Sequence, residues 1–72
     1  MLKIYSKAQC TYCDQAKALL KSKNIEFDEV RIDLDPSARE FLISAGHKAV
    51  PQIYENSLYI GGFDALRQHL NT

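Results

Sequence analysis

Residues 2–23 read LKIYSKAQCTYCDQAKALLKSK, and a change of hydrophobic period inside this stretch decides the fold class. The apolar run at 2–5 is typical of a short buried strand, and the polar residues 6–9 indicate a connecting loop. Residues 12–23 are rich in helix formers, with apolar side chains on one face and lysines on the other. The stretch therefore predicts a strand, a loop and an amphipathic helix, with a pair of cysteines where loop and helix meet.

The middle third predicts a second strand and a second helix. Residues 25–34 alternate apolar and charged side chains, and the phase slips at 28–29, which predicts a strand that begins or bulges there. Asp35 can cap the helix that Pro36 starts, and Gly46 fits the left-handed position after its end. Four residues at helical spacing predict one buried stripe on this helix: Ala38, Phe41, Leu42 and Ala45.

The last third predicts an antiparallel hairpin of residues 51–54 and 58–60, followed by a short helix after two glycines. The element order is β-α-β-α-β-β-α. A strand-helix-strand opening requires a parallel pair, and the hairpin adds antiparallel strands to the same sheet. We therefore expect an α/β fold with a four-stranded mixed sheet flanked by three helices, in a single domain spanning residues 1–72.

Composition limits the partners and the compartment. The chain has nine basic and nine acidic residues, so it presents no basic field for nucleic acid or an anionic membrane. Its apolar runs are short, and its start lacks the features of a signal peptide. Two close cysteines cannot build the multi-bridge framework of small secreted domains. We expect a cytoplasmic protein, a monomer, with neither nucleic acid nor membrane as partner.

The segment Cys10-Thr11-Tyr12-Cys13 is predicted to carry thiol chemistry. Two cysteines three residues apart at a helix start lie on one face, close enough for a reversible disulfide. The free backbone amides of the first turn stabilise a thiolate on Cys10 and lower its pKa, which makes Cys10 the nucleophile. Cys13 lies on the buried stripe and is the resolving thiol, and Lys7 adds a positive charge before the motif.

Two other interpretations of the cysteines are weaker. A structural zinc site needs four ligands, and besides the cysteines the chain offers only His47, His69 and carboxylates. No bound metal is therefore expected. Two inert buried cysteines would not need to lie at a strand-loop-helix junction.

Three motifs together resemble the glutaredoxin family over essentially the whole chain. They are Cys10-Thr11-Tyr12-Cys13, then Ala49-Val50-Pro51-Gln52 before the third strand, and Ile60-Gly61-Gly62-Phe63-Asp64 before the last helix. The resemblance implies a thioredoxin-like fold. It also implies an enzyme that reduces protein disulfides and glutathione mixed disulfides, with glutathione as reductant and ribonucleotide reductase as one candidate substrate.

The resemblance also implies where glutathione binds. Val50 would pair its backbone with the cysteinyl part of glutathione, beside a cis bond to Pro51. Gly62, Phe63 and Asp64 would hold the γ-glutamyl end through first-turn amides and the Asp64 carboxylate. Three residues would flank the glycyl end: Lys7, Tyr12 and Arg39. Without the family, Asp64 is more simply a favourable first-turn acid and Arg39 an exposed helical arginine.

Two departures from the family pattern keep other functions open. Thr11 stands where proline is common, which leaves the redox potential open, and Ala49 stands where threonine is frequent. One alternative is a thioredoxin-like hydrogen donor reduced by a flavoprotein reductase, although the Gly-Gly-Phe-Asp segment argues against it. The other is a dimer that holds an iron-sulfur cluster through Cys10 and glutathione.

Overall fold

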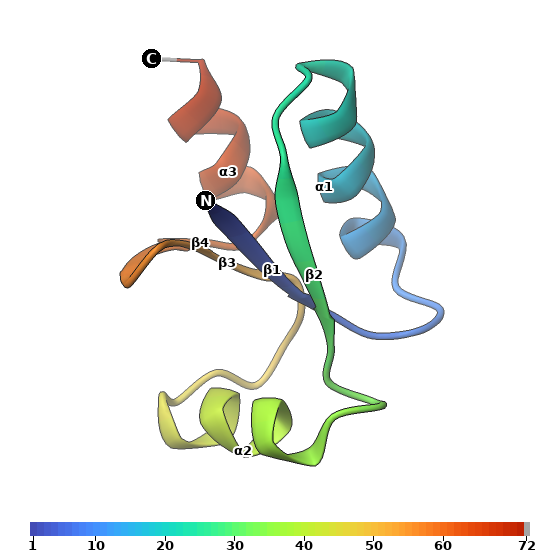
Figure 1. Cartoon of the computed structure of the whole chain (residues 1–72), viewed down its shortest axis with the longest axis vertical. Coiled ribbons are helices and arrows are strands. Elements are labelled where there is room, and N and C mark those ends of the chain that lie inside the picture. The colour runs from blue at the N-terminus through green and yellow to red at the C-terminus, as the bar shows by residue number, and fades with distance from the viewer. Residues whose placement is uncertain (72) are drawn as a thin grey trace.

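A mixed four-stranded sheet forms the frame of the molecule (Figure 1), in a computed structural model that describes residues 1–71. The strands lie in the order β2-β1-β3-β4; β1 is parallel to β2 and antiparallel to β3, and β4 is antiparallel to β3. The predicted element order is confirmed. In chain order the elements are β1 (Leu2–Ser6), α1 (Thr11–Ser22), β2 (Phe27–Arg31), α2 (Pro36–Ser44), β3 (Gln52–Glu55), β4 (Leu58–Gly61) and α3 (Phe63–Leu70).

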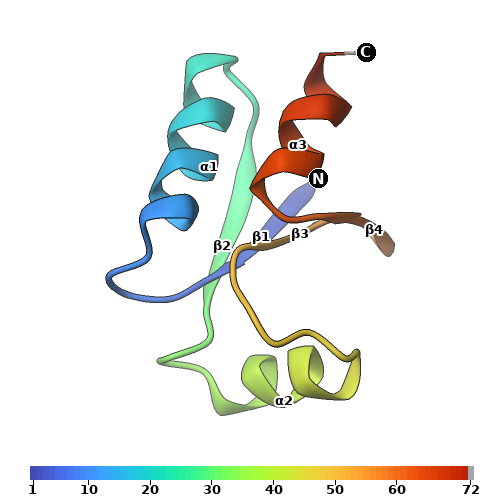
Figure 2. The ribbon, with the colours of Figure 1, turned by 180° about the vertical axis from the view of Figure 1, so that it is seen from behind.

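One face of the sheet is covered by α1 and α3, which lie side by side in both views (Figures 1 and 2). Alternate residues of a strand point to opposite faces, so Leu2 and Ile4 of β1 point to these helices together with Ile53 of β3. Burial of this apolar set holds both helices on the sheet. The core comprises Leu2, Ile4, Ala16, Leu20, Ile53 and Leu66.

The second helix, α2, packs against the opposite face through aromatic rings. The Phe41 ring lies 5.5 Å from that of Tyr5 and 5.7 Å from that of Tyr54, measured between centroids. The predicted buried stripe of α2 is only half right: Ala38 and Leu42 are buried, whereas Phe41 is 45% exposed and Ala45 is exposed. Only the line of side chains through Ala38 and Leu42 of this nine-residue helix is covered, and the rings of Tyr5 and Tyr54 shield only part of Phe41.

The prediction of a strand start near residues 28–29 agrees with the structure, since β2 begins at Phe27, but the predicted continuation to Leu34 is wrong. Strand β2 pairs with β1 in an unbroken register, and the sheet's irregularity lies instead between Ile53 and Tyr54, opposite β4. Ile25 donates its backbone N–H to Leu20 and so belongs to the end of α1. Leu34 lies in a turn and is 72% exposed. Ile25 and Leu34 continue the apolar alternation of the strand in the sequence, but their backbone N–H groups form hydrogen bonds within the local turns and not with a neighbouring strand.

The predicted helix boundaries rest on the expected local chemistry. The Asp35 carboxylate accepts the backbone N–H groups of Ser37 and Ala38 at 3.1 and 3.2 Å, and these bonds cap α2. Gly46 follows α2 with φ +86°, the left-handed conformation that glycine adopts without strain. Within residues 1–71, no helix has the length and apolarity required to cross a membrane.

Candidate active site

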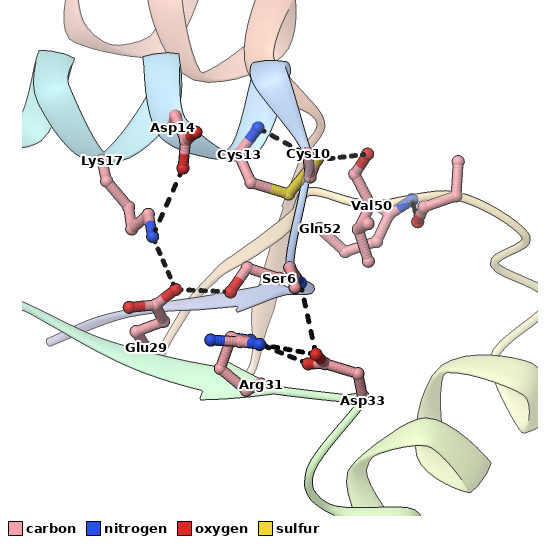
Figure 3. Close-up of a disulfide and its surroundings, with 12 residues drawn as sticks. Ser6, Cys10, Cys13, Asp14, Lys17, Glu29, Arg31, Asp33, Val50 and Gln52 are labelled. Carbon is pink, nitrogen blue, oxygen red and sulfur yellow. Dashed lines mark hydrogen bonds and ion pairs between the residues drawn. A yellow bond between two sulfur atoms is a disulfide. The ribbon is translucent and has the colours of Figure 1, made fainter.

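Cys10 and Cys13 form a disulfide at the start of α1 (Figure 3). Cys10 is the N-cap residue of the helix and is partly exposed, whereas Cys13 is completely buried. Their Cα atoms are 5.2 Å apart, within the range that a disulfide requires. The two sulfurs therefore differ in access, as the sequence predicts: one meets solvent and the other lies beneath it.

The loop that presents Cys10 is tied to the end of β2. Asp33 accepts the backbone N–H of Ala8 at 3.3 Å, and the Arg31 side chain donates to the same carboxylate, with Nε at 2.7 Å. The Arg31 hydrogen bond, aided by that of Ala8, lowers the pKa of Asp33 to about 2. Gln9 then takes a left-handed φ of 55°, which turns the chain into the helix. Asp33 was not singled out from the sequence, because only the fold brings it to this loop.

Two backbone groups contact the Cys10 sulfur. The Cys13 N–H points at Cys10 Sγ from 3.2 Å, which is the first-turn amide contact expected to stabilise a thiolate. The Val50 carbonyl oxygen lies 3.8 Å from the same sulfur (Figure 3). A carbonyl dipole oriented in this way favours a protonated sulfur, so the two contacts act in opposite directions on the thiol.

The segment that carries Val50 is held by hydrogen bonds from the sheet. The Val50–Pro51 peptide bond is cis, as the resemblance implies. Gln52, which is nearly buried, donates its side-chain amide to the Ala49 carbonyl at 2.9 Å and accepts the Tyr59 hydroxyl at 2.6 Å. This chain of bonds connects β4 to the loop beside Cys10, and it was not foreseen from the sequence.

The start of α3 lies against the cis peptide. Gly62 is the N-cap of α3, and a Cβ built on it would lie 3.6 Å from the Pro51 carbonyl oxygen. The Phe63 ring lies 6.1 Å from the Tyr12 ring of α1, measured between centroids. Of the predicted ligands, Tyr12, Pro51, Gly62 and Phe63 are thus brought close to one another, and Asp64 occupies the exposed first turn of α3.

The remaining predicted ligands line a cavity of about 540 Å³ between the β1–α1 loop and α2. Lys7, Arg39 and Val50 all contribute to its wall, although they are far apart in the sequence. Lys48 also lines it and was missed, since a lone loop lysine gives no local signal. Lys7, Arg39 and Lys48 form no ion pair with any residue of the described chain, so the cavity has three uncompensated positive charges at its wall.

Residues 2–60 match the family model named Glutaredoxin. The chain belongs to the glutaredoxin family. Among curated relatives, this glutaredoxin is 46% identical to Glutaredoxin 3 of Escherichia coli K12 over 66 residues, which cover 90% of the chain and 80% of the relative.

Solved structures agree with this family assignment. Glutaredoxin 1 from Francisella tularensis, solved with cacodylate, superposes with a TM-score of 0.83 at 32% identity, covering 97% of this glutaredoxin and 91% of that chain. NrdH-redoxin from Escherichia coli, described as glutaredoxin-like with a thioredoxin-like activity profile, also gives 0.83, at 25% identity and with 93% and 91% covered. The expected thioredoxin-like fold is confirmed.

The family and the geometry together define the activity. This glutaredoxin is a thiol-disulfide oxidoreductase whose redox-active disulfide is formed by Cys10 and Cys13. Among residues 1–71 there is no group of three or more His, Cys, Asp or Glu side chains arranged to hold a metal ion. His47, one of the few other candidate ligands, instead lies 3.0 Å from the Tyr54 hydroxyl through its Nε2 atom and stacks on Tyr59.

Proposed function

We propose that this glutaredoxin reduces protein disulfides and glutathione mixed disulfides, and that glutathione supplies the electrons. The observation that carries the proposal is the unequal placement of the two sulfurs. Cys10 is partly exposed and receives a helix amide, whereas Cys13 is buried one turn further along α1. A substrate disulfide can therefore reach Cys10 but not Cys13.

In the first half of the cycle, the Cys10 thiolate attacks one sulfur of a substrate disulfide. The substrate S–S bond breaks, a mixed disulfide forms at Cys10, and the departing sulfur leaves as a thiolate that takes a proton from water. Cys13 then loses its proton and attacks Cys10 Sγ. The second substrate thiolate leaves, and two electrons have passed from the cysteine pair to the substrate.

In the second half, two glutathione molecules return the electrons. The thiolate of the first attacks Cys10 Sγ, which breaks the Cys10–Cys13 bond and releases Cys13 as a thiol after it takes up a proton. The thiolate of the second attacks the glutathione sulfur of the mixed disulfide and releases glutathione disulfide and the Cys10 thiolate. The family resemblance supports glutathione as this reductant.

The proposed glutathione site extends on both sides of Cys10. Val50 would pair its backbone with the cysteinyl part of the tripeptide, as an added strand does, and Pro51 would keep this segment against Cys10. The first-turn amides of α3 at Gly62 and Phe63, with the Asp64 carboxylate, would hold the γ-glutamyl carboxylate and ammonium.

The glycyl carboxylate of glutathione would lie toward the cavity. Lys7 and Arg39 at the cavity wall are two of its three uncompensated positive charges, which suits a carboxylate. Tyr12 is 61% exposed and would cover the tripeptide from the α1 side.

A second candidate function is a hydrogen donor reduced by a flavoprotein reductase. The likeness to NrdH-redoxin, with its thioredoxin-like activity profile, favours it at the level of the fold. The higher identity to Glutaredoxin 3 and the match of residues 2–60 to the glutaredoxin model favour glutathione. Ribonucleotide reductase is a candidate protein substrate under either function, and a monomer in a reducing cytoplasm suits both, since such a compartment returns the cysteine pair to dithiols.

The test is a glutathione-coupled assay on wild type and on Cys10→Ser and Cys13→Ser. We expect Cys10→Ser to lose all activity while remaining folded, because the only other thiol of the chain, Cys13, is completely buried. Cys13→Ser should retain reduction of a small glutathione mixed disulfide, which needs only Cys10, and lose most reduction of protein disulfides. Full activity in Cys10→Ser, or reduction by a flavoprotein reductase with none by glutathione, would contradict the proposal.

A further inference from the structure

A second hollow adjoins the cavity beside Cys10, at the connection between β2 and α2. This second hollow has a volume of about 370 Å³. The two hollows share four lining residues, Ile32, Asp33, Arg39 and Ile43, so they are neighbours on the surface. The second hollow is lined by Ile32, Asp33, Leu34, Pro36, Arg39, Glu40 and Ile43.

The second hollow exposes large aliphatic side chains that the fold does not use. Leu34 is 72% exposed and Ile43 is 62% exposed, and neither belongs to the core cluster. Pro36 adds a third apolar wall. Neighbouring exposed aliphatic side chains beside a hollow are typical of surfaces that bind another polypeptide.

Charge divides the two hollows into unlike halves. Near Cys10, the positive charges of Lys7, Arg39 and Lys48 have no partner within the described chain, whereas Asp33 is already occupied by Arg31 and the Ala8 amide. Farther out, the wall keeps Arg39 and Asp33 and adds the unpaired acid Glu40. Its other four residues are apolar: Ile32, Leu34, Pro36 and Ile43. A ligand that fits both halves carries negative charge near the reacting sulfur and an apolar side chain beyond it.

We propose that the joined hollows are a docking groove for an extended segment of a disulfide-bearing substrate protein. In this segment an acidic side chain lies close to the reacting cysteine and faces Arg39, Lys7 and Lys48, and an aliphatic side chain lies beyond it against Leu34 and Ile43. The inference deepens the proposed reduction of protein disulfides and rests on it. Glutathione cannot fill the groove, because the tripeptide has no large aliphatic side chain.

The groove explains how one active site serves small and large substrates. A polypeptide bound through both halves places its cysteine at the inner end, which Val50 lines, and the Val50 carbonyl oxygen lies 3.8 Å from the Cys10 sulfur. Attraction by the positive wall raises the rate of encounter, and burial of an aliphatic side chain lengthens residence.

The experiment uses peptides that contain an internal disulfide and the pre-reduced full chain in single turnover, so that glutathione takes no part. One pair of peptides carries an Asp and a Leu before the reacting cysteine, and another pair carries them after it. Within each pair, the second peptide has Asn and Ser at those two positions. We expect the Asp-Leu peptide of one pair to be reduced about tenfold faster than its partner, a ratio that shrinks at high salt.

The variant Leu34→Gln tests the outer half of the groove, and Leu58→Gln is its matched control. Leu58 is also a strongly exposed leucine, at 65%, but it lies on β4 at the opposite edge of the sheet. We expect Leu34→Gln to slow the Asp-Leu peptide about fivefold and Leu58→Gln to leave it unchanged. Ile43→Gln should repeat the loss, and circular dichroism checks that each variant is folded.

Three results would overturn the inference. The first is equal reduction rates for the two peptides within both pairs. The second is an equal effect of Leu34→Gln and Leu58→Gln on reduction of the Asp-Leu peptide. The third is a wild-type dimer that Leu34→Gln converts to a monomer, which would assign the groove to a second copy of this chain. A small glutathione mixed disulfide separates this failure from that of the proposed function. Wild type, Leu34→Gln and Leu58→Gln should all reduce it at the same rate with glutathione, and its loss in wild type would count against the proposed function instead.

Discussion

The buried hydroxyl of Ser6 has the Glu29 carboxylate as its hydrogen-bond acceptor, and replacing Glu29 with alanine would leave this hydroxyl without one. Ser6 is fully buried and donates its hydroxyl to Glu29 Oε2 at 2.6 Å. Lys17 donates to the same oxygen at 2.8 Å and lies 3.7 Å from Asp14 (Figure 3). These contacts join β1, β2 and α1 just beneath the disulfide.

The expected cost of Glu29→Ala follows from these contacts. A buried hydroxyl left without an acceptor costs about 1–3 kcal/mol, and the loss of the Lys17 pair adds less than about 1 kcal/mol, because both side chains are partly exposed. We therefore expect a loss of about 2–3 kcal/mol in the free energy of unfolding. In a domain of this size, each kcal/mol lowers Tm by about 4–8 °C, so Tm should fall by about 8–24 °C.

The assay is urea unfolding of the oxidised protein at pH 7, followed by circular dichroism, on Glu29→Ala, Ser6→Ala and the double variant. Once Ser6 lacks its hydroxyl, no donor is left unsatisfied, so Glu29→Ala should cost about 1 kcal/mol or less in that background. An equal cost of Glu29→Ala with and without the Ser6 hydroxyl would refute the reasoning.

Acid provides a second measurement on the same carboxylate. The hydrogen bonds from Lys17 and then Ser6 lower the pKa of Glu29 from its ordinary value of 4.5. A lowered pKa stabilises the fold at pH values above 4.5, and this contribution is lost as the pH falls through the folded-state pKa. The stability difference between wild type and Glu29→Gln should therefore be constant near neutrality and shrink below about pH 4.5.

Two further changes test the loops around the site. Gly61→Ala should lower the free energy of unfolding in urea by about 2 kcal/mol or more, because the residue has φ +134° and a Cβ would lie 2.6 Å from that of Ala65. Gly62→Ala is the control and should cost much less, since the atom nearest to its Cβ would be 3.6 Å away. Equal costs for the two variants would contradict this reasoning. The pKa of Asp33 is lowered from 3.8 to about 2, so its carboxylate stabilises the fold above pH 3.8 and loses that effect as the pH falls toward 2. Asp33→Asn should remove this part of the acid unfolding transition. An acid transition unchanged by the substitution would contradict the prediction.

The parts of the fold that the sequence predicted correctly depend on neighbours along the chain. The helical spacing of four residues predicts the buried face of α1: Cys13, Ala16, Leu19 and Leu20. All are fully buried except Leu19, which is half-buried against the core. The cap at Asp35 and the left-handed glycine at 46 are also local, because each depends on backbone groups within a few residues.

The incorrect predictions involve contacts with distant parts of the chain. Helical spacing places Phe41 and Ala45 in line with Leu42, but how wide a stripe the sheet covers depends on where α2 settles on it. The apolar alternation that ends at Leu34 continues past the last pairing of β2 with β1, and pairing, unlike alternation, is not visible in one segment.

The candidate site divides in the same way. The cysteine pair and its helix start are local and were predicted from the residues alone. The tie between Ala8 and Asp33, and the position of Lys48 in the cavity wall, join segments more than twenty residues apart. The predicted glutathione-binding positions near Val50 and Asp64 came from the resemblance to a family, since a proline after a valine does not by itself indicate a binding site.

Strand direction explains why three separated motifs meet at one disulfide. Strand β3 is antiparallel to both of its neighbours, so its first residue lies beside the ends of β1 and β4: Tyr5 pairs with Gln52, and Ile53 with Gly61. The loop to Cys10, the cis peptide before β3 and the start of α3 must therefore lie at the same end of these three strands. Slipping β3 by two residues would keep its buried face but move Pro51 by about 7 Å, out of reach of the Cys10 sulfur. Register, more than any single side chain, therefore brings the Val50 carbonyl to the reacting thiol.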